Sequence, residues 1–107
     1  MPLPKEIKTD KNGYLTDSNQ WTKELAELIS REEGIELTDE HWQVINYVRQ
    51  FYLEFNTSPS IRPLIKYLKT KPSGDKVSSL YLQMLFPEGA AKQATKIAGL
   101  PKPARCT

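Results

Sequence analysis

The sequence predicts a mainly α-helical domain of about five helices around a helix-turn-helix-like core, with a short N-terminal β-hairpin and a flexible C-terminal arm. Apolar residues recur at helical spacing in successive segments, and capping or helix-breaking residues bound each segment. One Asn-Gly pair stands near the N-terminus. The 107 residues suffice for one domain, which we expect to span 1–107.

The N-terminal hairpin is predicted from Asn12 and Gly13, because a type I′ turn needs a positive φ at both of its central residues. Short strands are expected at about 5–10 and 14–16. Strands of this length are not stable alone, so we expect them to pack on the helices.

The first helix is expected to start from a cap at Asp17 or Ser18. It should end at Gly34, since glycine tolerates the left-handed conformation that terminates many helices. Its apolar residues follow the first of them, Trp21, by four, seven and eight positions, and this spacing places them on one face of a helix. The predicted face comprises Trp21, Leu25, Leu28 and Ile29.

The second helix has the clearest start, at the capping residue Thr38, and is expected to run to about Phe55. Acidic residues follow Thr38 and suit the positive end of the helix dipole. His41 is expected to be structural or exposed, because no second histidine or nearby cysteine completes a metal site. The predicted core stripe is Val44, Ile45, Val48, Tyr52 and Phe55, widened by Trp42 and Phe51.

Three shorter helices should follow. The third is expected at about 61–70, with Pro63 in its first turn, where a missing N–H costs little. The fourth should run from a cap at Asp75 to Pro87, and an alanine-rich fifth from 88 to 98. Residues predicted to face the core are Ile61, Leu64, Ile65 and Leu68 in the third helix and Val77, Leu80, Tyr81, Met84 and Leu85 in the fourth.

The last segment, 99–107, holds two prolines two residues apart and the only cysteine of the chain, Cys106. Such prolines disfavour a helix and favour an extended form, so we predict a mobile arm. A thiol near the end of this arm is hard to bury and becomes a nucleophile once deprotonated. One thiol can hold sulfur as a persulfide and pass it on, but it cannot form an internal disulfide. Judged by its position alone, Cys106 is equally well explained as an incidental tail cysteine without a function.

Charge is divided unevenly along the chain. Residues 1–55 contain six Lys/Arg and eleven Asp/Glu, whereas residues 56–107 contain nine and two. A basic second half suits contact with RNA or an acidic partner, or reflects solvated lysines on exposed helix faces. We expect Arg105 to favour the Cys106 thiolate by charge, and the terminal carboxylate of Thr107 to oppose it to a comparable degree. The predicted partner-binding residues are Arg62, Lys66, Lys69, Lys92, Lys96 and Lys102.

Composition favours a cytoplasmic location. Hydrophobic residues make up 38% of the chain, and no apolar run approaches the ~20 residues that span a bilayer. The first ten residues, MPLPKEIKTD, lack the apolar centre of a signal peptide. A single cysteine requires no oxidising compartment.

Two segments, SPSIRPLIKYLK at 58–69 and LFPEGAAKQATKIAGLPKPARC at 85–106, closely resemble the DsrC/TusE family. Segments 10–15 and 37–52 are similar too, and the terminal GLPKP-x-x-C block is the most specific. The resemblance implies a helical fold with a hairpin and a mobile arm whose last cysteine, here Cys106, bears sulfur. Members that partner dissimilatory sulfite reductase have a second cysteine upstream. Here Thr95 takes that position, which points to the single-cysteine TusE branch.

The resemblance therefore implies a sulfurtransferase that acts as a persulfide carrier, without a metal or organic cofactor. It implies uptake of sulfur on Cys106 from a TusBCD-like donor complex. Delivery would be to an MnmA-like tRNA 2-thiouridylase for wobble-uridine 2-thiolation, with indirect contact to tRNA. Two alternatives stay open. One is a sulfite-reductase-associated protein, and the other is a DNA-binding regulator whose third helix offers few base-reading residues beyond Arg62 and Lys66.

Overall fold

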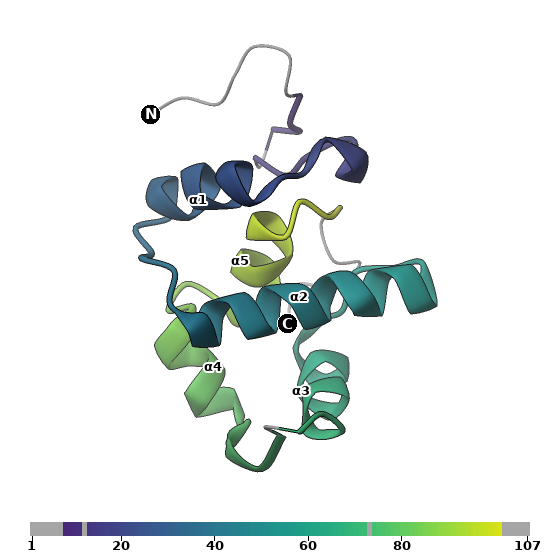
Figure 1. Cartoon of the computed structure of the whole chain (residues 1–107), viewed down its shortest axis with the longest axis vertical. Helices are drawn as coiled ribbons and strands as arrows, with labels where there is room; N and C mark the ends of the chain where they lie inside the picture. Colours follow the sequence, from purple (N-terminus) through teal and green to yellow (C-terminus); the bar gives the residue numbers. More distant parts are fainter. Residues whose placement is uncertain (1–7, 12, 73, 102–107) are drawn as a thin grey trace.

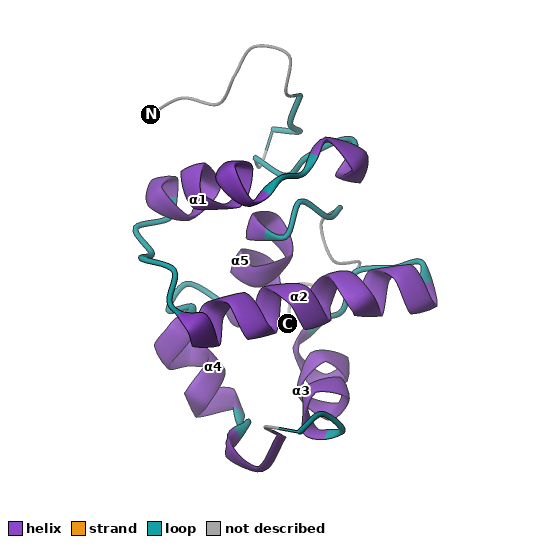
Figure 2. Cartoon of the chain, in the orientation of Figure 1, coloured by secondary structure: helices purple, strands orange, loops and turns teal. Residues whose placement is uncertain are grey.

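The structure, a computed structural model, describes residues 8–11, 13–72 and 74–101 (Figure 1). Figure 2 shows that helices dominate this part of the chain, which confirms the mainly α-helical prediction. Two short 3-10 turns, η1 (Ser18–Gln20) and η2 (Gly74–Lys76), precede α1 and α4. The described α-helices are α1 (Lys23–Glu32), α2 (Asp39–Phe55), α3 (Ile61–Lys69), α4 (Ser79–Leu85) and α5 (Ala90–Ile97).

The short helix α5 is the centre of the fold. Helices α1, α2, α3 and α4 all pack against it, and Figure 1 shows it between α1 and α2. Its small side chains allow this close approach, since Ala94 on the helix and Ala98 just after it are fully buried. The hydroxyl of Thr95 is also fully buried, and within the described residues it has no hydrogen-bond partner.

Helix α1 starts later than the sequence predicts. Thr22 caps it, and the Thr22 hydroxyl accepts a hydrogen bond from Leu25 N at 3.1 Å. The carboxylate of Asp17 instead accepts from Asn19 N at 2.9 Å, which starts η1. Thr22 is extended, so the backbone is not helical between the two elements. The predicted end is confirmed, because Gly34 has a φ of +74° and follows the last turn.

Helix α2 has the predicted bounds, and His41 fixes its start. The Thr38 amide donates to His41 Nδ1 at 3.1 Å, completing a capping box. His41 Nδ1 accepts here, so its Nε2–H donates to Leu85 O at 2.7 Å, and the ring also stands edge-on to Phe86. This buried histidine has the structural role that the sequence predicts.

The predicted core stripe of α2 holds in the middle of the helix and fails at its end. Val44, Ile45 and Val48 are buried, but Phe55 is 53% exposed. The last turn of α2 extends beyond the core. Phe55 there packs on Phe51, with ring centres 4.6 Å apart, as part of a surface aromatic cluster.

The predicted buried face of α4 is wrong at Leu80 and Met84, which are 66% and 75% exposed. Leu82 and Phe86 are fully buried in their place. The cap is Ser78, whose hydroxyl accepts from Tyr81 N, whereas Asp75 lies within η2. The 3-10 turn and the extended Ser78 separate two helical elements. A single helical period applied across both elements therefore predicts the wrong buried face of α4.

The predicted N-terminal hairpin is not supported. A single antiparallel bridge joins Thr9 and Leu15, and no strand forms within the described residues; part of the first predicted strand lies outside them. The turn closes from Gly13 N to Asp10 O at 3.0 Å, so Gly13 is the last residue of the turn instead of one of its two central residues. The chain enters η1 soon after Leu15, which leaves no length for a second strand. Leu15 is buried, so the segment does pack on the helices.

Candidate functional site

The reactive residue predicted from the sequence, Cys106, lies outside the described residues, as do Lys102 and Arg105. Pro101 is the last described residue before them. The structure thus describes the base of the C-terminal segment, residues 97–101, which we call the arm root. Gly99 and Leu100, predicted to begin the mobile arm, are buried, and Leu100 is only 1% exposed. Mobility of the remaining segment stays a prediction.

The arm root begins with a tight helix end. Gly99 N donates to Lys96 O and Leu100 N donates to Thr95 O, both at 3.1 Å, so the two bonds form a Schellman motif. Gly99 has a φ of +73°, and a Cβ built there would overlap Cδ1 of Trp21. Only glycine meets both requirements, because it tolerates the left-handed backbone and has no side chain to collide with the indole.

Trp21 and Arg49 hold the carbonyl groups at the end of α5. The indole Nε1–H of Trp21 donates to Ile97 O at 2.8 Å, and the Arg49 guanidinium donates to Ala98 O at 2.5 Å. The Arg49 guanidinium also lies over the Trp21 ring, 4.2 Å from its centre. Burial removes water from this group and lowers the pKa of Arg49 below its usual value. Its positive charge suits the negative end of the α5 dipole.

Ser58 holds the arm root one residue beyond Leu100. Its hydroxyl donates to Pro101 O at 2.6 Å, and the side chain is buried in the loop between α2 and α3. We call Trp21, Arg49 and Ser58 the arm anchor. Sequence patterns assign Trp21 to the core and Ser58 to a turn, and they give Arg49 no role. A positive charge directly after buried Val48 is the one sequence signal that points to it.

The predicted basic residues do not form one cluster. Arg62, Lys66 and Lys69 are exposed on α3, and Lys92 is exposed on α5. Lys96 is instead part of the fold. Its Nζ lies 2.9 Å from Glu33 Oε2, and both side chains are about 20% exposed. The structure therefore leaves the α3 residues open to a partner and ties Lys96 to the end of α1.

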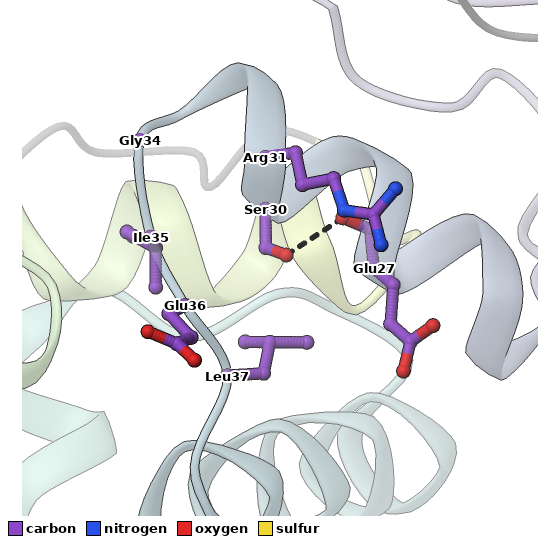
Figure 3. A pocket seen from close by; sticks show the side chains of 7 residues that line it. All are labelled: Glu27, Ser30, Arg31, Gly34, Ile35, Glu36 and Leu37. Atoms are coloured by element: carbon purple, nitrogen blue, oxygen red, sulfur yellow. Dashed lines mark hydrogen bonds between the residues drawn. The ribbon is translucent and has the colours of Figure 1, made fainter. Parts of the chain in front are cut away.

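A surface pocket of about 510 Å³ opens at the end of α1 and in the loop that leads to α2. Figure 3 shows the side chains of Glu27 and Glu36 on either side of Leu37, with the Ser30 hydroxyl bonded to Glu27 O at 2.8 Å. Its described lining residues, Glu27, Ser30, Arg31, Gly34, Ile35, Glu36 and Leu37, carry no thiol or imidazole. No group of three potential metal ligands occurs in the described part of the chain. None of its helices could cross a membrane.

Comparison with known sequences gives matches along almost the whole chain. The family model "DsrC like protein" matches residues 3–107. The "Sulfurtransferase TusE homolog" of Haemophilus influenzae is 60% identical over 101 residues, which is 94% of this chain and 93% of that protein. The "Sulfurtransferase TusE" of Escherichia coli is 59% identical over 102 residues, covering 95% and 94% of the two chains.

Solved structures show the same fold. The NMR structure of Allochromatium vinosum DsrC has a TM-score of 0.85 and 42% identity, covering 94% of this chain and 90% of that one. The crystal structure of the oxidized gamma-subunit of the dissimilatory sulfite reductase (DsrC) from Archaeoglobus fulgidus has a TM-score of 0.79 and 38% identity, covering 94% and 92%. With a family model that matches residues 3–107 and relatives near 60% identity, the chain belongs to the DsrC-like protein family.

Proposed function

We propose that this protein is a sulfurtransferase of the sulfur-relay type, which carries sulfur as a persulfide on Cys106. The observation that supports this most is the identity of about 60% to TusE sulfurtransferases over nearly the full length of both chains. The chemistry fits the sequence as well. Cys106 is the only thiol in the chain and lies next to last.

The transfer consists of two thiol exchange steps. In the first, the Cys106 thiolate attacks the outer sulfur of a donor persulfide, a new S–S bond forms, and the donor leaves as a thiolate. In the second, a thiolate of the acceptor attacks the outer sulfur on Cys106 and releases the Cys106 thiolate. Each step forms one S–S bond and breaks one, so no oxidant, reductant, metal or organic cofactor is consumed. Arg105, adjacent in the sequence, stabilises the thiolate by charge.

The proposed donor is a TusBCD-like complex and the proposed acceptor is an MnmA-like tRNA 2-thiouridylase, which modifies the wobble uridine. Contact with tRNA would be indirect, through the acceptor. The proposed setting is the cytoplasm. Exposed Arg62 and Lys66 support contact with an acidic protein surface or with bound tRNA. Lys102 is proposed as a further contributor, and Lys96 would contribute only on release from its ion pair with Glu33.

The other two readings have less support. The chain is less identical to the DsrC structures, at 42% and 38%, than to the TusE proteins. Thr95 also offers no second thiol for a two-cysteine cycle. A DNA-binding role would rest on α3, which has nine residues with Pro63 in its first turn. Arg62 and Lys66 are exposed there, but two basic residues suit backbone contact more than base reading.

The test compares wild-type protein with Cys106→Ser, which replaces the thiol with a hydroxyl of nearly equal size. Both proteins are incubated with a persulfide-loaded donor and analysed by mass spectrometry. We expect the wild type to gain the mass of one sulfur atom at Cys106 and the variant to gain none. Thiolation of the wobble uridine, followed by retarded migration of tRNA in a mercury-containing gel, should also stop in cells that carry only the variant. Normal thiolation in those cells would overturn the proposed function.

A further inference from the structure

We propose that Trp21, Arg49 and Ser58 are positioning residues for sulfur transfer, because they fix the arm root and so set the direction from which Cys106 approaches a partner. This inference rests on the proposed function and adds residues to it. The arm anchor is assembled from three separate parts of the chain. Trp21 precedes α1, Arg49 is on α2, and Ser58 is in the loop after α2.

The three anchor side chains share one kind of target. They donate to the carbonyl oxygens of Ile97, Ala98 and Pro101. The last carbonyl groups of a helix have no partner within the helix, and water or nearby side chains usually satisfy them. Here Trp21 and Arg49, 76 and 49 positions away, satisfy the carbonyl groups at the end of α5. Ser58 satisfies the carbonyl group of Pro101, beyond the helix. In Figure 1 the end of α5 lies between α2, which holds Arg49, and the segment that precedes α1, which holds Trp21.

The Ser58 bond has an effect that apolar packing does not supply. Leu100 is buried and holds one point of the arm root. Pro101 is exposed, so its ring gains little from burial and does not fix the next point. The hydrogen bond from Ser58 to Pro101 O supplies that second point. Two fixed points define a direction, so Ser58 orients the chain where it leaves the domain.

Anchoring also limits how far the thiol reaches. Cys106 lies five residues beyond Pro101 in the sequence. A chain spans at most roughly 3.3–3.6 Å per residue, so Cys106 stays within about 18 Å of Pro101. The molecule is 40 Å long, so this reach covers less than half of its length. A donor or acceptor must therefore dock around the arm root. Release of Pro101 would lengthen the free tether and lower the effective concentration of the thiol at the partner site.

The central test uses Ser58→Ala, which removes the hydroxyl from one anchor residue. Persulfide-loaded protein is mixed with the thiouridylase, and the transfer rate is measured against the thiouridylase concentration. We expect the rate at saturation to fall about threefold to tenfold, because orientation and effective concentration are lost. The half-saturating concentration should stay the same, because Ser58→Ala leaves the folded docking surface intact. Ser58→Thr retains a hydroxyl and should restore the rate.

Three controls separate positioning from a general structural effect. Transfer from Ser58→Ala to a small thiol, dithiothreitol, should equal that of the wild type, because a diffusing thiol needs no orientation. Its thermal unfolding midpoint should stay close to the wild-type value. Thr57→Ala alters the exposed neighbour of Ser58 and should change none of these readouts. Arg49→Lys is not a control but a second variant of the arm anchor. It keeps the charge and loses the planar stacking on Trp21, so it should slow transfer to the thiouridylase as Ser58→Ala does.

The outcomes distinguish this inference from the proposed function. Transfer to the thiouridylase at the wild-type rate in both Ser58→Ala and Arg49→Lys would overturn the positioning role and leave the carrier role intact. An equal loss with dithiothreitol and with the thiouridylase would also overturn it, because reactivity and not orientation would then have changed. Wild-type protein that takes up no sulfur from the donor would overturn the proposed function, and the positioning role would fall with it.

Discussion

The guanidinium of Arg49 lies 4.2 Å from the centre of the Trp21 ring, and both side chains donate to consecutive carbonyl groups at the end of α5. One residue precedes α1 and the other is on α2, so this pair ties two helices to a third. It also joins the core of the domain to the segment that leads to Cys106. The energetic contribution of this pair can be measured directly.

We expect Arg49→Ala to lower the free energy of unfolding by about 1.5–3 kcal/mol, because it removes a charged hydrogen bond and a cation–π contact. Urea denaturation followed by tryptophan fluorescence or circular dichroism measures the change. Arg31→Ala is the matched control, since Arg31 is exposed on α1 and should contribute less than about 0.5 kcal/mol. An equal, small change in both variants would mean that Arg49 does not stabilise the arm root.

Gly99→Ala should destabilise the protein by about 2–5 kcal/mol, through a left-handed backbone and a collision with Trp21. Gly34→Ala is an unusually close control. Gly34 has nearly the same φ, +74° against +73°, and also ends a helix, but nothing lies within 4 Å of its added Cβ. Its cost should be only about 1–2 kcal/mol, the backbone part alone. Similar thermal midpoints for the two variants would show that the contact with Trp21 is unimportant.

His41→Ala should lower the free energy of unfolding by about 2–4 kcal/mol, because it breaks a capping box and leaves Leu85 O without its donor. His41→Gln retains a side chain that can accept from the Thr38 amide, so it should recover part of the loss. Chemical denaturation of the three proteins gives both values. If His41→Gln were as unstable as His41→Ala, the cap would contribute little and the loss would come from packing on Phe86.

Reversing the charge of Arg62 and of Lys96 should have different effects. Arg62→Glu should weaken association with the acceptor and reduce its salt dependence, with little change in stability, because Arg62 is exposed on α3. Lys96→Glu should destabilise the fold, because it places a second negative charge beside Glu33. Binding measurements at several salt concentrations, together with thermal unfolding, separate these effects. Unchanged binding by Arg62→Glu would remove Arg62 from the partner surface.

Local signals predicted some helix boundaries correctly and missed others, since the caps of α1 and α4 are Thr22 and Ser78. Thr38 starts α2 and Gly34 ends α1 as predicted, because capping and a left-handed glycine depend only on neighbouring backbone groups. The predicted face of α4 failed because an extended Ser78 separates the two helical elements. Phe55 failed for a different reason. It shares a helix face with buried Val44 and Val48, but the core does not extend to the last turn of α2.

The sequence by itself determined that this is a helical protein whose one thiol is the next-to-last residue. Its motifs also resemble those of the family to which the chain belongs. These properties depend on residue types, spacing and local backbone preferences. Only the tertiary structure decided that Gly99 and Leu100 belong to the core and that Trp21, Arg49 and Ser58 hold the arm root. Their hydrogen bonds join residues 43 to 76 positions apart, and no local pattern encodes a contact that forms only when separate helices pack together.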